Sequence, residues 1–139
     1  MEPTRSAFPG FDVARAGMRA QMKRAEVVAA NLANMHVTRT ATGEPYRRRT
    51  VVFEELLAEG DTGSGVQVAE VREDHETPFI ETWNPGHPHA NADGFVLLPN
   101  VDLFAEMVDL SVAARAFEAN LAAMRVYRGM LEDTLATFR

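Results

Sequence analysis

Two histidines separated by one residue form the pattern in this sequence that most resembles a metal site. His87 and His89 flank Pro88, and Asp93 follows four residues after the second histidine. Imidazole nitrogens and a carboxylate oxygen together could bind Zn²⁺ in a metal-dependent hydrolase. The same segment contains the turn-forming residues Pro85, Gly86, Pro88 and Gly94. In such turns polar side chains usually bond the backbone, and the spacing matches none of the common zinc motifs, so we predict a structural turn without a metal.

No other arrangement in the sequence is typical of an enzyme. The three serines, Ser6, Ser64 and Ser111, lie outside any Gly-x-Ser-x-Gly nucleophile motif. The glycine-rich segment 62–65 lacks the lysine of a phosphate-binding loop. There is no cysteine, which excludes disulfides, thiolate zinc sites and thiol catalysis. We therefore predict that the protein is not an enzyme and uses no cofactor.

The composition fits one folded domain. The chain has 139 residues, of which 46% are apolar, so a core can form. The net charge is −6 and the only dense basic run is 47–49, which excludes the basic face of a nucleic-acid-binding protein. No apolar run is long enough to span a membrane, so we expect no direct membrane insertion. Residues 1–10 lack the apolar core of a cleaved secretory signal, and we expect none.

A first helix is predicted from residue 11 to residue 34, a segment without proline. Its apolar residues repeat mostly at steps of three and four, which is typical of a packed helix: Phe11, Met18, Met22, Ala25, Ala29 and Leu32. We expect Asp12 to cap the start of this helix and Asn34 to adopt the left-handed conformation just after its end.

A second, longer helix is predicted from residue 103 to residue 138. Its main apolar residues recur every seven positions, at Leu103, Leu110, Phe117, Met124, Leu131 and Phe138, with Met107, Ala114, Leu121 and Leu135 midway between them. We call these residues the heptad row and expect them to pack in the helix pair or in the assembly. Arg128 interrupts the row, and we interpret it as a determinant of register or partner. Asn100 or Asp102 is expected to cap the start.

The length of this second helix predicts a partner. At about 1.5 Å per residue it would extend roughly 55 Å, whereas a compact chain of this size has a radius of gyration of about 14 Å. Its opposite face is also apolar, at Val112, Ala116, Ala119, Ala123, Val126 and Met130. We call these residues the small-residue row. Because a solvent-exposed face would instead carry charged side chains, we predict that this row is an intersubunit face.

The middle of the chain, residues 35–99, predicts a small β module. Short segments with strand character lie at 50–53, 66–71, 79–83 and 95–98, with a turn at 93–94. We expect one or two hairpins. The predicted fold is therefore mostly α with a small β insert. Residues 1–34 and 100–139 pair as a coiled-coil core, and residues 35–99 form the loop-rich insert.

Several motifs resemble those of the flagellar basal-body rod proteins, and in particular of the proximal rod. They are NLAN at 31–34, GEPYRR at 43–48, PGHPHANADGFV at 85–96, PNVD at 99–102, EMVD at 106–109 and ARAFEAN at 114–120. The matched positions include Asn31, Leu32, Asn34, Pro85, Gly86, His87, Pro88, Gly94, Pro99, Asn100, Arg115 and Asn120. The resemblance covers nearly the whole chain.

The resemblance implies a structural subunit of the bacterial flagellar rod. In that family the terminal helices pair as a coiled coil and assemble with neighbours into a helical tube that transmits torque from motor to hook across the periplasm. The middle segment lies on the outside. The implied partners are copies of the chain, other rod proteins and the flagellar type III export apparatus, which exports these proteins without a cleaved signal peptide.

Two alternative functions remain open at this point. A cytoplasmic coiled-coil adaptor or regulator with a β insert would be stably folded and helical on its own. A metal-dependent hydrolase would use His87, His89 and Asp93 and would bind metal stoichiometrically. A rod subunit would complete its order only in the assembly.

Overall fold

Two long helices and two β-hairpins make up the part of the chain that the computed structural model describes, residues 9–56 and 65–138. The elements in chain order are α1 (Pro9–Ala33), β1 (Arg49–Glu55), β2 (Val66–Glu73), β3 (Ile80–Trp83), β4 (Phe95–Leu98) and α2 (Leu103–Thr137). The mostly helical fold with a small β insert is therefore confirmed. Ser6, Ser64 and most of the segment 62–65 lie outside the described residues.

The helix ends differ in part from the expected ones. α1 begins at Pro9, where proline is well suited because the first helical N–H needs no partner. Asp12 therefore lies inside the first turn and accepts a hydrogen bond from Arg15, so its predicted capping role is wrong. The predicted left-handed conformation of Asn34 is also wrong, because no described residue other than glycine has a positive φ. Its side chain instead donates to the carbonyl of Ala30, 2.8 Å away, at the end of the helix.

The start of α2 follows the expectation closely. Of the two candidate caps, Asp102 has this role, and its carboxylate accepts from the backbone N–H of Ala105 at 2.7 Å. α2 then continues for 35 residues, about 52 Å, without a break. Within the described ranges, neither helix is both long and apolar enough to cross a membrane.

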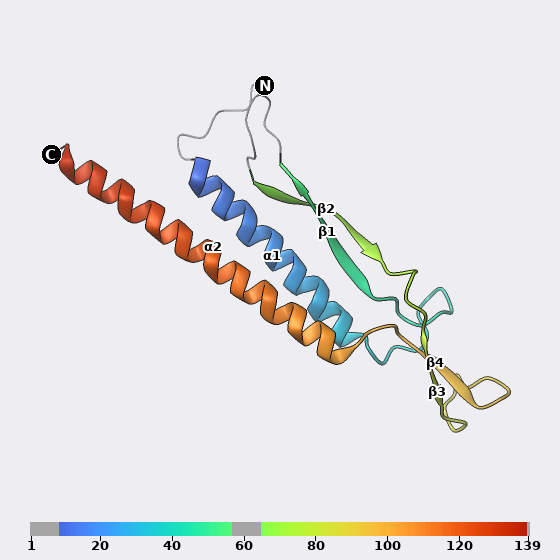
Figure 1. Cartoon of the computed structure of the whole chain (residues 1–139). Helices are drawn as coiled ribbons and strands as arrows, with labels where there is room; N and C mark the ends of the chain where they lie inside the picture. The colour runs from blue at the N-terminus through green and yellow to red at the C-terminus, as the bar shows by residue number, and fades with distance from the viewer. Residues whose placement is uncertain (1–8, 57–64, 139) are drawn as a thin grey trace.

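The four predicted strands are present and form two separate antiparallel hairpins. β1 pairs with β2, with an irregularity between Val52 and Phe53, and β3 pairs with β4. Gly94, with φ of +82°, forms the turn that leads into β4, a conformation that other residues adopt at a cost. The hairpin β1–β2 lies along α1, whereas β3–β4 extends beyond one end of the helix pair (Figure 1).

The two helices run antiparallel, with α1 between α2 and the hairpin β1–β2 (Figure 1). Along the contact, Asn31 bonds Glu106, Gly17 lies against Asn120 and Gly10 lies against Tyr127. A Cβ atom built on Gly17 would lie 2.6 Å from the Asn120 side-chain oxygen, so a larger residue at position 17 would displace the Asn120 side chain.

This register leaves part of α2 without α1 beside it. Because Tyr127 lies opposite Gly10, residues 128–137 run past the first described residue of α1. Figure 1 shows this end of α2 projecting beyond α1. We call residues 128–138 the α2 tip.

Candidate assembly surfaces and the polar junction that positions them

A buried polar junction joins the end of α1 to the start of α2. Asn31 is completely buried, and all of its side-chain hydrogen-bonding capacity is used. Its amide nitrogen donates to the Arg49 carbonyl at 2.8 Å and to the Glu106 carboxylate at 3.0 Å. Its oxygen accepts from the Tyr46 hydroxyl and from the Arg49 backbone N–H, each at 2.9 Å. One side chain thus fixes α1, the segment before β1, and α2 relative to one another.

Glu106 is the charged centre of this junction and has no exposed surface. The guanidinium of Arg48 donates to its other carboxylate oxygen at 2.5 Å. Both carboxylate oxygens are therefore bonded, which is the condition under which a buried charge is tolerated. Burial raises the pKa of Tyr46, so its hydroxyl remains a hydrogen-bond donor at neutral pH.

Asn100 extends the junction toward the hairpins. Its side-chain oxygen accepts from the Arg48 backbone N–H at 2.8 Å. Its amide nitrogen donates to the carbonyls of Asp74 and Thr77, at 3.0 and 3.1 Å. Asn100 is therefore not a helix cap. It holds the segment between β2 and β3 against the start of α2.

The histidines at 87 and 89 lie in a turn and bond within the protein. The ring nitrogen Nδ1 of His87 accepts from the backbone N–H of His89, and Nδ1 of His89 lies 2.8 Å from the Thr38 hydroxyl. Among the residues that the structure describes, no three side chains of His, Asp or Glu lie close enough together to hold a metal ion. The arrangement supports a structural turn.

We expect the double variant His87→Ala/His89→Ala to bind as little zinc as the wild type, because the described residues place no group of three His, Asp or Glu side chains close enough to hold a metal ion. The lost bond to Thr38 should lower the free energy of unfolding by only about 1 kcal/mol. Isothermal titration with zinc and urea unfolding measure the two effects. Stoichiometric zinc binding by the wild type alone would instead support the hydrolase.

The heptad row flanks the helix contact. The α2 residues that face α1 most directly also recur every seven positions, but they are not members of the heptad row. They are Glu106, Ala113, Asn120 and Tyr127. Half-buried members of the heptad row border them: Leu110, Phe117, Leu121, Met124 and Leu131. Leu103 and Met107 are exposed, as is Met22 of α1, whereas Met18 and Leu32 are half-buried.

The small-residue row lies mostly on the surface of the single chain. Ala116 is half-buried, and the exposed members are Val112, Ala119, Ala123, Val126 and Met130. Arg115 is exposed, and the side chain of Asn120 donates to the carbonyl of Ala116. Arg128 is exposed and pairs with Glu132 in the next turn, so its ion-pair partner among the described residues lies on α2 itself and not on α1.

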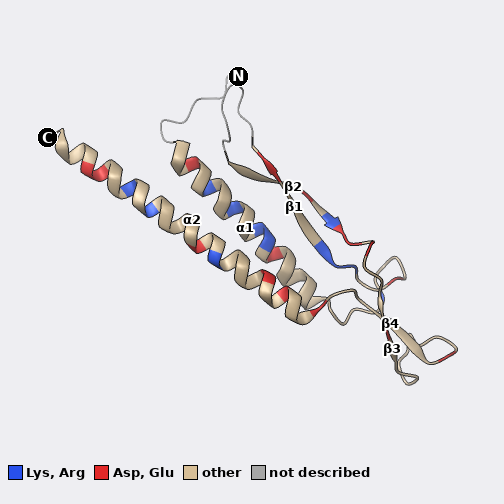
Figure 2. Ribbon diagram, in the orientation of Figure 1, with Lys and Arg blue, Asp and Glu red and all other residues tan. Residues whose placement is uncertain are grey.

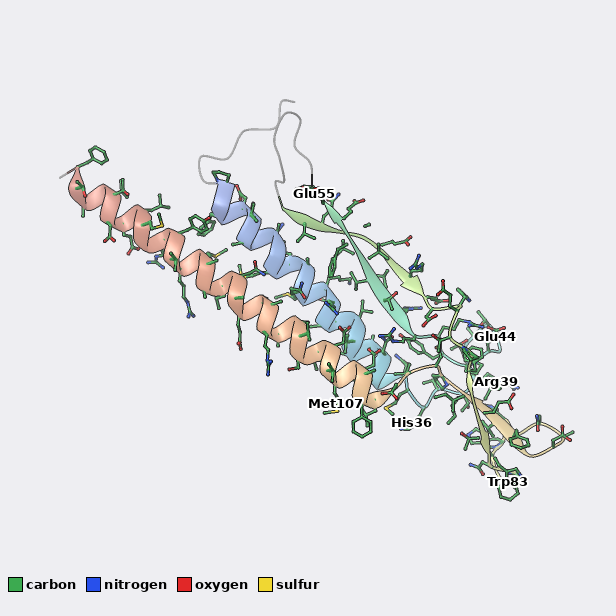
Figure 3. The ribbon with its side chains drawn as sticks, viewed as in Figure 1. His36, Arg39, Glu44, Glu55, Trp83 and Met107 are labelled. Carbon is green, nitrogen blue, oxygen red and sulfur yellow. The ribbon has the colours of Figure 1, made fainter. Side chains whose placement is uncertain are left out.

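The exposed apolar side chains are concentrated on α2. Ten of them lie at residues 103–138, including Phe104, Val108 and Met130. Figure 3 shows Met107 projecting outward at the start of this helix, and Trp83 at the far end of the molecule on β3. Figure 2 shows residues of both charge signs at intervals along α2, so the exposed apolar residues of this helix are interspersed with charged ones. Apolar exposure on this scale marks an interaction surface.

A long antiparallel helix pair with an exposed apolar surface has the architecture of a structural subunit that completes its core in an assembly. Residues 11–39 match the family described as flagella basal body rod protein, and residues 92–137 match the C-terminal family of the flagellar basal body rod proteins FlgEFG. Each of the two helices therefore lies in a segment of the chain that matches a flagellar rod family.

Whole-chain relatives identify the family more closely. Flagellar basal-body rod protein FlgC of Salmonella typhimurium is 40% identical over 90% of this chain and 92% of its own. The FlgC proteins of Bacillus subtilis and Borreliella burgdorferi are 38% and 34% identical, over 94% and 93% of this chain and 97% and 95% of their own. The chain belongs to the FlgC family of flagellar basal-body rod proteins. It is a structural rod subunit of the flagellar basal body.

The sequence alone did not reveal Glu106, Tyr46 and Arg48 as members of one site. Glu106 is separated from Asn31 by 75 residues, and nothing local distinguishes it from a solvated glutamate in a first helical turn. The one available indication was its place shortly after the PNVD motif at 99–102 and within an apolar run, which is too common a pattern to assign a partner.

Proposed function

We propose that this chain is a proximal-rod subunit that transmits torque from the motor to the hook through packed helices. The observation that carries the proposal is the exposed apolar surface of α2, which the described residues of the chain leave uncovered. Torque passes through interfaces between subunits, so the function depends on their packing and needs no catalytic group. The polar junction suits this role because it holds α1 and α2, the helices that transmit the torque in this proposal, in one fixed arrangement.

We assign residues 1–34 and 100–139 to the helical core of the rod and residues 35–99 to a β-rich insert at its outside. The hairpin β1–β2 packs along α1, so the insert supports the core directly. Within the core, we assign the small-residue row and the exposed members of the heptad row to contacts with other rod proteins and with further copies of this chain.

We further propose that the chain leaves the cytoplasm through the flagellar type III export apparatus and reaches the periplasmic part of the rod without a cleaved signal peptide. The absence of cysteine supports this route, because an unfolded chain without thiols crosses an oxidising compartment without forming disulfides.

Deletion of the gene tests the proposal. We expect cells without it to be non-motile and their purified basal bodies to lack a complete rod, with both defects restored by the wild-type gene. An epitope-tagged chain should be recovered in basal bodies. Motile deletion cells with complete rods, or a tagged chain found only in the cytoplasm, would favour the adaptor function instead.

A further inference from the structure

The helix pair contains a buried charge whose counter-charge comes from outside the two helices. The Glu106 carboxylate of α2 has no exposed surface. From α1 it receives one hydrogen bond, donated by the uncharged amide of Asn31 at 3.0 Å. Its ion-pair partner is Arg48, which belongs to residues 46–49, a segment that leads into β1 and that we call the strap. Because a buried charge without a charged partner is costly, α1 and α2 alone form an unfavourable contact here.

The strap supplies most of the hydrogen bonds of the two buried side chains, Asn31 and Glu106. The Tyr46 hydroxyl and the Arg49 backbone N–H donate to the amide oxygen of Asn31, and the Arg49 carbonyl accepts from its nitrogen. Arg48 donates to Glu106 at 2.5 Å. Of the five hydrogen bonds that the structure gives these two side chains, four involve the strap and one joins the helices directly. The contact between α1 and α2 at this end therefore depends largely on residues that belong to neither helix.

The strap is in turn held in position by the insert and by the start of α2. The backbone N–H of Tyr46 donates to the Val37 carbonyl at 3.0 Å, and the Arg48 carbonyl accepts from the Asp74 backbone N–H at 2.8 Å. The Arg48 backbone N–H donates to the Asn100 side chain, also at 2.8 Å. Residues before β1 and after β2 thus place the Arg48 side chain beside the helix pair. The position of the counter-charge is therefore set by the folded insert.

The counter-charge has to come from the strap rather than from α1 or from a neighbouring subunit. The arginine of α1 that contacts α2, Arg24, is already paired with Asp109. Asn31 and Glu106 have no exposed surface, so a side chain of another subunit has no access to them in the folded chain. Assembly therefore cannot replace what the strap supplies.

We propose that the strap makes the pairing of α1 with α2 conditional on the folded insert. Both helices lie in segments that match flagellar rod families, 11–39 and 92–137, whereas the strap lies between these segments. The helices pair stably only when Arg48 reaches Glu106. The helical core that we assign above is therefore incomplete without residues 46–49. This dependence is a property of the single chain and does not rest on the rod function.

Cysteine cross-linking measures the helix pairing directly, because the chain has no cysteine of its own. Arg24→Cys/Asp109→Cys places one thiol on each helix, at side chains that contact each other in the native chain. The purified chain is treated with a short bismaleimide, and the initial rate of intramolecular cross-linking is followed by mass spectrometry. In this background we expect Arg48→Met to lower the rate at least fivefold, because Glu106 then has no counter-charge.

A second substitution tests whether the charge is the cause. Adding Glu106→Leu to Arg48→Met should restore the rate to within twofold of the background, because no buried charge then lacks a partner. The matched control is Arg49→Ala in the same strap. Its guanidinium pairs with Glu73 at the surface, 3.2 Å away, and its removal should change the rate less than twofold.

Gly17→Cys/Asn120→Cys provides a second pair of thiols on the same helix contact, since a Cβ atom at position 17 lies directly against the side chain of residue 120. The same order of rates is expected with this pair. An unchanged rate in Arg48→Met, an equal loss in Arg49→Ala, or no recovery with Glu106→Leu would overturn the conditional pairing. Each of these outcomes leaves the rod function standing, which the deletion experiment tests separately.

Discussion

Glu106→Ala lowers the free energy of unfolding by about 3 kcal/mol, the lower end of the usual cost of breaking a buried ion pair, because the Arg48 side chain is 27% exposed and water can partly replace the carboxylate. The carboxylate has no exposed surface, and its removal leaves Arg48 with an unpartnered guanidinium and Asn31 with one bond fewer. A small domain is stable by only about 5–15 kcal/mol in total, so the variant should be marginally folded at best. Urea unfolding followed by circular dichroism measures the difference.

Two controls separate the buried pair from a general effect of changing α2. Glu118→Ala removes an exposed carboxylate from the same helix and should change stability by less than about 0.5 kcal/mol. Replacing both partners, as in Arg48→Met/Glu106→Leu, should recover part of the loss because no unpaired charge stays buried. A loss below about 1 kcal/mol for Glu106→Ala would show that the junction does not hold the helices together.

Ala119→Glu and Ala123→Glu are expected to abolish motility while leaving the isolated chain folded. Both alanines are exposed in the single chain, and glutamate forms helices nearly as well as alanine, so folding is unaffected. In the rod we place both residues against a neighbouring subunit. A buried carboxylate without a partner costs several kcal/mol there, and the longer side chain separates the two backbones. Swimming assays, electron microscopy of basal bodies and circular dichroism of the purified variants measure these effects.

Leu121→Glu serves as the comparison for these two variants. Leu121 is half-buried beside the contact with α1, so this change should destabilise the chain itself as well as the assembly. If cells with Ala119→Glu and Ala123→Glu swim normally and contain complete rods, the small-residue row faces solvent and our assignment of it is incorrect.

The elements of this fold could be predicted because their determinants are local. The seven-residue repeat from Leu103 onward specifies α2 almost to the residue, and alternation in the segment 66–71 indicates β2. The start of α1 was misplaced because Asp12 is a good capping residue in isolation, whereas Pro9 is already suited to the first turn. Capping preferences are small energies that neighbouring residues readily override.

The packing of the elements could not be predicted in the same way. Large side chains in the heptad row suggested which face of α2 meets α1. The contact instead places Gly17 of α1 against the Asn120 side chain and buries Asn31 beside Glu106. The charged pair beneath it, Glu106 with Arg48, depends on segments far apart in the chain. Periodicity contains no information about such pairs.

Because α1 and α2 lie far apart in the sequence, the order of synthesis also determines when the molecule can fold. Asn31 finds Glu106 only after the next 75 residues have been made, which takes roughly 4–15 s at the usual rate of synthesis. Until then α1 can pack only on the hairpin β1–β2, and a single amphipathic helix is marginally stable in water. Closing so long a loop also carries an entropic cost before any native contact compensates for it. The native helix pair therefore cannot form until synthesis is nearly complete. Under the export route that we propose, this delay gives the export apparatus time to engage the chain before it folds.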